Sequence, residues 1–259
     1  MGERVDFEIK GKVARLTLNR PEKRNAIDDL ALDELTTCFS EADSDKNVRA
    51  IVFGGNGPAF SSGADLDYIL KLSRSSHSEN LDDSMALKNL LLSIYMSKKL
   101  VCAVVRGPAL AGAFGLVLSC DIIFASEKAK FGFTEVKVGF VPAVVMKVAL
   151  RKMTEPNVRR LVLTGKIIDA AEALRIGLIP ELIADNEIES RVESFLKEFA
   201  RGTSKKAVEL TKEVLSQVKD LTLEDALKYG AMMNAKARST MDFKKGIEAF
   251  LNKKHLEWE

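Results

Sequence analysis

Residues Arg106–Ala125, RGPALAGAFGLVLSCDIIFA, decide how this chain folds, because they lead from a strand pattern into an apolar helix pattern. The preceding run Val101–Val105 has the length and composition of a buried strand. The first amides of a helix have no partner within it, so a carbonyl or oxyanion above Ala111-Gly112-Ala113 could accept hydrogen bonds from the chain. Small residues also let a helix pack closely on a strand, and this stretch alone supports both interpretations about equally.

On the N-terminal side of this stretch, the sequence predicts two strands, a helix and a third strand. The first two are expected over Phe7–Ile9 and Val13–Leu18, Asp28 is expected to cap the helix, and Ala50–Phe53 has the pattern of a buried strand. The strand-strand-helix order recurs around the quoted stretch, which is followed by predicted short strands over Ile122–Phe124 and Ala129–Phe131.

Beyond Val141-Pro142 the chain is predicted to be largely helical. We therefore expect a strand-rich body over residues 1–200 and a helical C-terminal region over 201–259, with the joint at Arg201-Gly202-Thr203. The predicted helices cover Val144–Lys152, Asn157–Leu163, Ala170–Ile176, Ile188–Ala200, Ser204–Val218, Leu223–Ala237 and Phe243–Asn252. The polar segment Leu72–Ser84 is expected to be a mobile surface excursion before a helix from about Met85 to Lys98.

The composition of the 259 residues is that of an ordinary globular protein, with 46% hydrophobic and 29% charged residues. A formal net charge of +2 gives no overall attraction to nucleic acid or anionic lipid, so neither is an expected partner. The opening residues lack the apolar core of a secretory signal and no window resembles a membrane span, which favours a cytoplasmic location. Cys38, Cys102 and Cys120 are expected to be reduced core residues, not a metal site.

Two further segments could contribute chemistry. Ser62-Gly63-Ala64-Asp65-Leu66 ends a turn-rich loop and offers a second exposed amide. Two amides on one oxygen would polarise a thioester carbonyl and stabilise an enolate. Glu135 lies in the mostly apolar run Phe131–Pro142, where poor hydration would raise the pKa of its carboxyl toward the range of a general acid or base. Pairing of Glu135 with Lys137 is the more common alternative for such a residue.

Five sequence blocks follow one another along the chain, at Asn19–Ala26, Phe60–Leu66, Gly107–Asp121, Phe131–Pro142 and Leu163–Ile179. Together they resemble the enoyl-CoA hydratase/isomerase (crotonase) superfamily over nearly the whole chain. The resemblance implies an α/β fold, a crotonase-like (ClpP/crotonase) spiral of repeated ββα units with a helical C-terminal trimerisation region, and a homotrimer or homohexamer. It also implies an acyl-CoA thioester as substrate, with no nicotinamide, flavin or metal cofactor.

By this resemblance, the thioester oxygen lies between the amides of Ala64 and Gly112, and Glu135 is the catalytic carboxylate. A typical hydratase of the family has a second glutamate three residues after the oxyanion glycine, and here that position is Gly115. Its glycine triplet is also altered, to Ala111-Gly112-Ala113. We expect the missing side chain at Gly115 to open volume beside the acyl chain, which would suit a branched or cyclic acyl group.

The departure at Gly115 keeps two reactions open. Hydration of a 2-enoyl-CoA needs an oriented water and a proton donor, tasks that two carboxylates share most easily. A Δ3,Δ2-enoyl-CoA isomerase needs only one base, which Glu135 supplies, whereas the wider Phe131–Pro142 block looks more like a hydratase. Hydration is the preferred prediction, isomerisation the second, and a non-catalytic acyl-CoA- or RNA-binding paralogue the alternative from another class. A dienoyl-CoA isomerase is disfavoured because its additional acid is replaced by Ala143.

The remaining candidates concern the rest of the acyl-CoA. Lys23 and Arg24 follow the first strand pair, where family members approach the phosphates of CoA, although solvated surface charge explains them nearly as well. Asp65, Leu66 and Asp67 adjoin the Ala64 amide and are predicted to line the substrate site. Phe250, Lys253 and Lys254 are weaker candidates for reaching the CoA of a neighbouring subunit.

Overall fold

The computed structural model describes residues 2–258, in which a five-stranded sheet forms the centre of an α/β body. Its strand order is β1-β2-β3-β4-β6, with β1 and β2 antiparallel and the other neighbours parallel. The predicted hairpin is confirmed, since β1 and β2 join at Gly11-Lys12. These strands are Val5–Lys10 (β1), Val13–Leu18 (β2), Ala50–Gly55 (β3), Leu100–Val105 (β4) and Ile122–Ala125 (β6).

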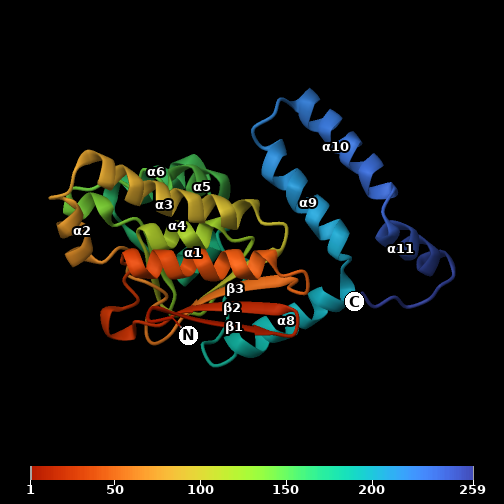
Figure 1. The fold of residues 1–259 in the computed structure, drawn as a ribbon, viewed down its shortest axis with the longest axis horizontal. Helices are drawn as coiled ribbons and strands as arrows, with labels where there is room; N and C mark the ends of the chain where they lie inside the picture. The colour runs from red at the N-terminus through yellow and green to blue at the C-terminus, as the bar shows by residue number, and fades with distance from the viewer. Residues whose placement is uncertain (1, 259) are drawn as a thin grey trace.

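The sheet is covered on both faces because alternate residues of its central strands point into two different cores. Ile51 and Val101 belong to the larger core, which α1, α3 and α4 help to form, whereas Val52 and Cys102 belong to a smaller core closed by α8 (Figure 1). This explains why β3 and β4 are apolar throughout rather than alternating. The helices are Asp29–Ser44 (α1), His77–Met96 (α3), Gly112–Ser119 (α4) and Ile188–Gly202 (α8).

A second, three-stranded sheet of order β5-β7-β8 holds the region that the sequence singled out. Strand β5 runs parallel to β7, with Ala109 opposite Phe131, and α4 begins two residues after β5 ends. The predicted passage from a strand through small residues into a helix is therefore confirmed. These elements are Pro108–Leu110 (β5), Lys130–Gly132 (β7) and Ile167–Asp169 (β8), with the 3-10 helices Pro21–Lys23 (η1) and Glu135–Val138 (η2).

The prediction of a mobile excursion over Leu72–Ser84 is wrong. Helix α2, Leu66–Leu72, leads through four residues into α3, which begins at His77. Ser76 and Glu79 form a complete capping box, with the Ser76 Oγ accepting from the Glu79 N–H and the Glu79 carboxylate accepting from the Ser76 N–H. Two satisfied helix-start amides outweigh the low content of large apolar residues that suggested a loop.

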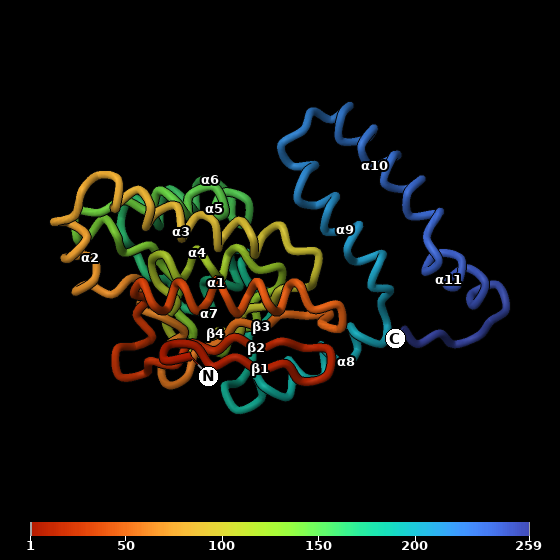
Figure 2. Tube along the Cα trace, in the orientation of Figure 1, coloured from red at the N-terminus to blue at the C-terminus, as the bar shows by residue number. Residues whose placement is uncertain are grey.

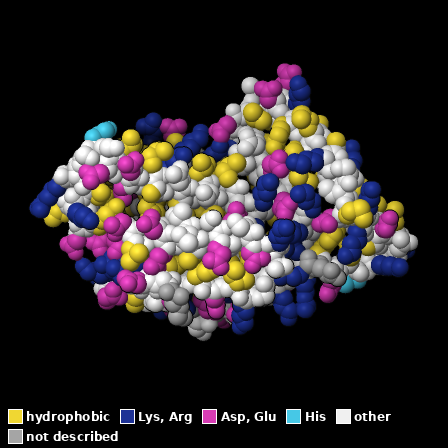
Figure 3. Space-filling model, in the orientation of Figure 1, with side chains coloured by type: hydrophobic (Ala, Val, Ile, Leu, Met, Phe, Trp, Pro, Cys, Tyr) yellow, Lys and Arg dark blue, Asp and Glu magenta, His cyan; other side chains and the backbone are white. Residues whose placement is uncertain are grey.

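The C-terminal helices extend away from the body (Figure 2). Helix α9 follows α8 after two residues, and the chain end returns so that the Trp258 N–H donates to the Arg201 carbonyl at 2.8 Å. Apolar side chains remain exposed on these helices, among them Leu223, Leu227 and Phe250. Figure 3 shows hydrophobic side chains among charged ones on the surface of this part of the molecule. The division between residues 200 and 201 stays a prediction. The remaining helices are Met146–Lys152 (α5), Glu155–Thr164 (α6), Ala170–Arg175 (α7), Lys205–Val218 (α9), Leu223–Arg238 (α10) and Met241–Leu251 (α11).

Between residues 2 and 258, none of the helices combines the length and the apolar character that crossing a membrane requires.

Candidate functional site

Backbone pairing brings together the two loops that were predicted to supply amides. The Ser61 N–H donates to the Pro108 carbonyl and the Leu110 N–H donates to the Ser61 carbonyl, both at 3.0 Å. Gly63 has φ +95°, and a Cβ atom built on it would lie 2.8 Å from Ala111 Cβ. The close approach therefore depends on glycine at position 63 for two reasons, the backbone conformation and the space.

The amides of Ala64 and Gly112 are left free by the arrangement around them. Ala64 forms an isolated parallel β-bridge with Ile27. Its two hydrogen bonds, both of 2.8 Å, run from the Ile27 N–H to the Gly63 carbonyl and from the Asp65 N–H to the Ile27 carbonyl, so the Ala64 N–H takes no part. Gly112 is the first residue of α4, where an amide has no intrahelical partner. Within residues 2–258 neither N–H donates to another group of the chain. Both can therefore donate to a ligand oxygen.

Ala111, which precedes α4, has a backbone conformation that non-glycine residues rarely adopt. Its φ and ψ are 53° and −132°. The Ala111 N–H donates to the Gly132 carbonyl at 2.9 Å, and the Phe114 and Phe133 rings are 4.8 Å apart. These contacts hold the start of α4 against the segment that leads from β7 into Glu135.

Glu135 opens η2 and is only 8% exposed. Its Oε2 atom is buried and, among the described residues, has no hydrogen-bond partner. Loss of hydration raises the pKa of the Glu135 carboxyl above its ordinary value, opposed by a backbone hydrogen bond. The alternative pairing with Lys137 is wrong, because the Lys137 side chain lies along Gly165 and forms no ion pair with Glu135. A poorly hydrated, unpaired carboxyl can take or give a proton at an adjacent substrate.

The expectation that Gly115 opens volume beside the acyl chain is wrong. A Cβ atom built on Gly115 would lie 2.1 Å from Val145 Cγ1 and 3.6 Å from Leu91 Cδ1. Val145, the residue before α5, is 2% exposed and fills the space that a side chain at 115 would need. The reason is that α5 packs directly on α4. The structure therefore gives no support to a branched or cyclic acyl group at this point.

The predicted substrate-lining residues beside Ala64 have different surroundings. Asp65 caps α2 and forms an ion pair with Arg20 at 2.7 Å. Burial opposes ionisation of Asp65, but hydrogen bonds from the Tyr68 and Asp67 amides and from Arg20 together hold the pKa of its carboxyl below the usual value. Asp65 thus fixes the loop, whereas Leu66 is exposed next to the Ala64 amide. Arg20 was not among the predicted residues, and no local sequence pattern indicates its ion pair with Asp65.

The two basic candidates, Lys23 and Arg24, both lie beside the loop that carries Ala64. The Lys23 Nζ is 3.1 Å from Asp67 Oδ2, and both side chains are exposed, so this pair is weak. Arg24 is exposed and its carbonyl accepts from the Ser62 N–H at 3.0 Å. Lys23, Arg24 and Asp67 are thus brought to the loop that carries Ala64, where they are open to solvent.

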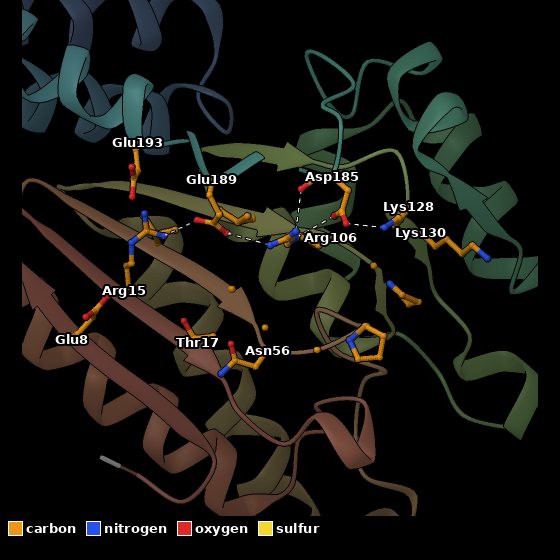
Figure 4. Close-up of a pocket in the computed structure, with 18 residues that line it drawn as sticks. Glu8, Arg15, Thr17, Asn56, Arg106, Lys128, Lys130, Asp185, Glu189 and Glu193 are labelled. Carbon is orange, nitrogen blue, oxygen red and sulfur yellow. Dashed lines mark hydrogen bonds and ion pairs between the residues drawn. The ribbon is translucent and has the colours of Figure 1, made fainter. Parts of the chain in front are cut away.

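A separate groove of about 980 Å³ lies on the face of the sheet that α8 partly covers, and none of the predicted site residues lines it. Figure 4 shows that charged side chains cross it in a row of alternating sign: Arg15, Glu189, Arg106, Asp185 and Lys128. Hydrogen bonds from Lys128 and Arg106 lower the pKa of Asp185 to about 2. These charges satisfy one another, so the groove is a poorer candidate for chemistry than the region around Glu135.

Comparison with known proteins agrees with the fold and the sequence blocks. The family model for enoyl-CoA hydratase/isomerase matches residues 8–259. A Thermus thermophilus protein whose name assigns it provisionally to the enoyl-CoA hydratases is 36% identical over 95% of this chain and 96% of its own. The (E)-benzylidenesuccinyl-CoA hydratase of Thauera aromatica is 31% identical over 95% of each chain. A crystal structure of an enoyl-CoA hydratase from Shewanella pealeana superposes with a TM-score of 0.93 at 27% identity, covering 99% of this chain and 96% of that chain.

These matches define a protein of the crotonase fold. The chain belongs to the enoyl-CoA hydratase/isomerase family.

Proposed function

We propose that this protein is an enoyl-CoA hydratase-type enzyme that acts on an acyl-CoA thioester through two backbone amides and a single glutamate. The observation that carries the proposal is the buried Glu135 carboxyl, whose Oε2 atom has no hydrogen-bond partner within residues 2–258. It lies on a segment held against the start of α4, where the Gly112 N–H donates to no group of the described chain. The names of the relatives support hydration as the reaction. No cofactor is required, because the reaction is not a redox reaction and coenzyme A is part of the substrate.

In this proposal the thioester oxygen accepts hydrogen bonds from the Ala64 and Gly112 amides, which stabilise the enolate that forms as the reaction proceeds. The Glu135 carboxylate takes a proton from water while the water oxygen bonds to C3 and the double-bond electrons move toward the thioester oxygen. The protonated Glu135 then returns a proton to C2. Lys23 and Arg24 would approach the phosphates of the CoA.

Isomerisation of a 3-enoyl-CoA is the second candidate, and the filling of the space at Gly115 by Val145 favours it. Moving a double bond requires removal of a proton from C2 and its return to C4, with no water added. One carboxylate can do both steps on one face of the substrate.

The test is to incubate the protein separately with a 2-enoyl-CoA and a 3-enoyl-CoA and to identify the products. Formation of 3-hydroxyacyl-CoA from the 2-enoyl substrate is expected, with loss of at least about 100-fold in kcat for Glu135→Gln, since a general acid-base group contributes about 10²–10⁴ in rate. Binding of both substrates without any product would overturn the proposal in favour of an acyl-CoA-binding protein. Full activity in Glu135→Gln would overturn the assignment of the base.

A further inference from the structure

Position 115 lies one helical turn after Gly112 and on the same face of α4. Side chains on a helix lean toward its N-terminus, so a side chain at 115 would cover the first turn, where the free Gly112 amide is. In this chain that surface is covered from outside α4. The Val145 side chain occupies the position of the absent Cβ atom, and Leu87 Cδ2 lies 3.6 Å from the position of a Cβ atom on Gly112.

The side chains that lie nearest to the hypothetical Cβ atoms of Gly112 and Gly115 are aliphatic. Leu91 comes from α3, as does Leu87, and Val145 comes from the residue before α5. Leu91 and Val145 belong to the main apolar core, and Leu87 packs against it. An aliphatic surface cannot hold a water molecule in a fixed orientation, because an ordered water needs two or more polar partners.

We infer that Val145 is a specificity-determining residue, which keeps the site at one carboxylate and thereby limits water addition relative to movement of the double bond. This inference rests on the proposed function. With Val145 in place, position 115 supplies no polar group to the attacking water, and Glu135 is the one carboxylate that the proposed mechanism uses to hold it. Removing the side chain of Val145 would create room for a second carboxylate or its water beside the first turn of α4.

The first experiment supplies that carboxylate from solution. Val145→Gly is assayed with and without formate, with Val144→Gly as the matched control, since Val144 is the adjacent and only partly buried valine. Added formate is expected to raise the ratio of hydration to isomerisation at least fivefold in Val145→Gly and to leave it unchanged in the wild type and in Val144→Gly. An equal response of the three proteins would overturn the inference.

The second experiment supplies the carboxylate from the chain. Gly115→Glu alone is expected to bring no gain in kcat for hydration, because the Cβ atom of the new side chain would lie 2.1 Å from Val145 Cγ1. Combined with Val145→Gly, it is expected to raise kcat for hydration at least tenfold over Val145→Gly alone, whereas combination with Val144→Gly brings no gain. Thermal unfolding of each variant identifies any that do not fold, and the formate experiment does not depend on the Gly115→Glu substitution.

Different results would contradict the proposed function and the role of Val145. If the wild type turns over neither a 2-enoyl- nor a 3-enoyl-CoA, the proposed function is wrong. If the wild type turns over either substrate, but formate does not change the product ratio of Val145→Gly and the double variant does not gain in kcat for hydration, the proposed function stands and the role of Val145 is wrong.

Discussion

Gly63 and Ala111 lie so close together that a Cβ atom on Gly63 would be 2.8 Å from the Cβ atom of Ala111. The same hypothetical atom would be 3.0 Å from the Leu110 carbonyl oxygen. Each residue immediately precedes one of the two free amides, at Ala64 and Gly112. The spacing of the proposed oxygen-binding amides therefore depends on the contact between Gly63 and Ala111.

We predict that Gly63→Ala separates the two loops. The φ of +95° strains any side chain at this position, and the contact with Ala111 forces a further shift. Activity should fall about 100-fold, which is the cost of losing one donor to an oxyanion. Gly177→Ala is the control, since Gly177 has φ +74° but nothing within 4 Å of its built Cβ atom. Steady-state kinetics of both variants check the prediction, and similar losses would mean that backbone strain alone is responsible.

Ala111→Gly is predicted to stabilise the protein. The conformation at φ 53° and ψ −132° costs an alanine about 1–3 kcal/mol, whereas glycine adopts it freely. The greater freedom of glycine in the unfolded chain removes about 0.4–1 kcal/mol of that gain, which leaves about 1 kcal/mol. Urea unfolding measures the difference. Ala113→Gly, at a buried helical position, should instead lose about 1 kcal/mol, and a loss in both variants would contradict the strain at Ala111.

Much of the fold could be predicted because it depends on local patterns. The apolar runs of β3 and β4, the Asp28 cap of α1 and the small residues before α4 were all readable from neighbouring residues. The start of α3 was readable too, since Ser76-x-x-Glu79 is the pattern of a capping box. The low apolar content of the segment outweighed that signal in the prediction. In the structure this composition belongs to the exposed part of a helix.

The candidate site was only partly predictable. Its amides and Glu135 lie within recognisable sequence blocks, but the contact of Val145 with Gly115 joins residues 30 positions apart and depends on how α5 packs on α4. A missing side chain in a sequence does not reveal whether it leaves a space, because another element can fill it. The sequence also could not exclude a pair between Glu135 and Lys137, because the contact of the Lys137 side chain with Gly165 depends on tertiary packing.

The stability of Glu135→Gln should differ from that of the wild type in a pH-dependent way. Burial raises the pKa of the folded-state carboxyl above the ordinary 4.5, so the unfolded chain releases its proton first as the pH rises. Below pH 4.5 the carboxyl is protonated in both states and the wild type keeps its full stability. Between 4.5 and the raised pKa the wild type should lose stability relative to Gln, and above it the difference should be constant. Urea unfolding from about pH 4 to 8 measures this, and a difference independent of pH would contradict the buried state of Glu135.

Attachment of the C-terminal helices to the body should depend on Lys212 of α9. Its Nζ lies 2.5 Å from Asp121 Oδ2 and also donates to the Lys99 carbonyl, and its side chain is only 9% exposed. Asp121 in turn accepts from the Val101 N–H at 2.7 Å, so the pair connects α9 to β4. Lys212→Met keeps the length of the side chain but leaves Asp121 without its cation, which should cost about 1–3 kcal/mol.

The matched control for Lys212 is Lys206→Met. Lys206 pairs with Glu209 at 2.8 Å on the same helix but is 46% exposed, so its loss should cost under about 1 kcal/mol. Limited proteolysis between α8 and α9 should be faster for Lys212→Met than for Lys206→Met, because only the former releases α9 from the sheet. Equal protease sensitivity and equal unfolding free energies in the two variants would show that apolar packing, not this ion pair, holds the C-terminal helices to the body.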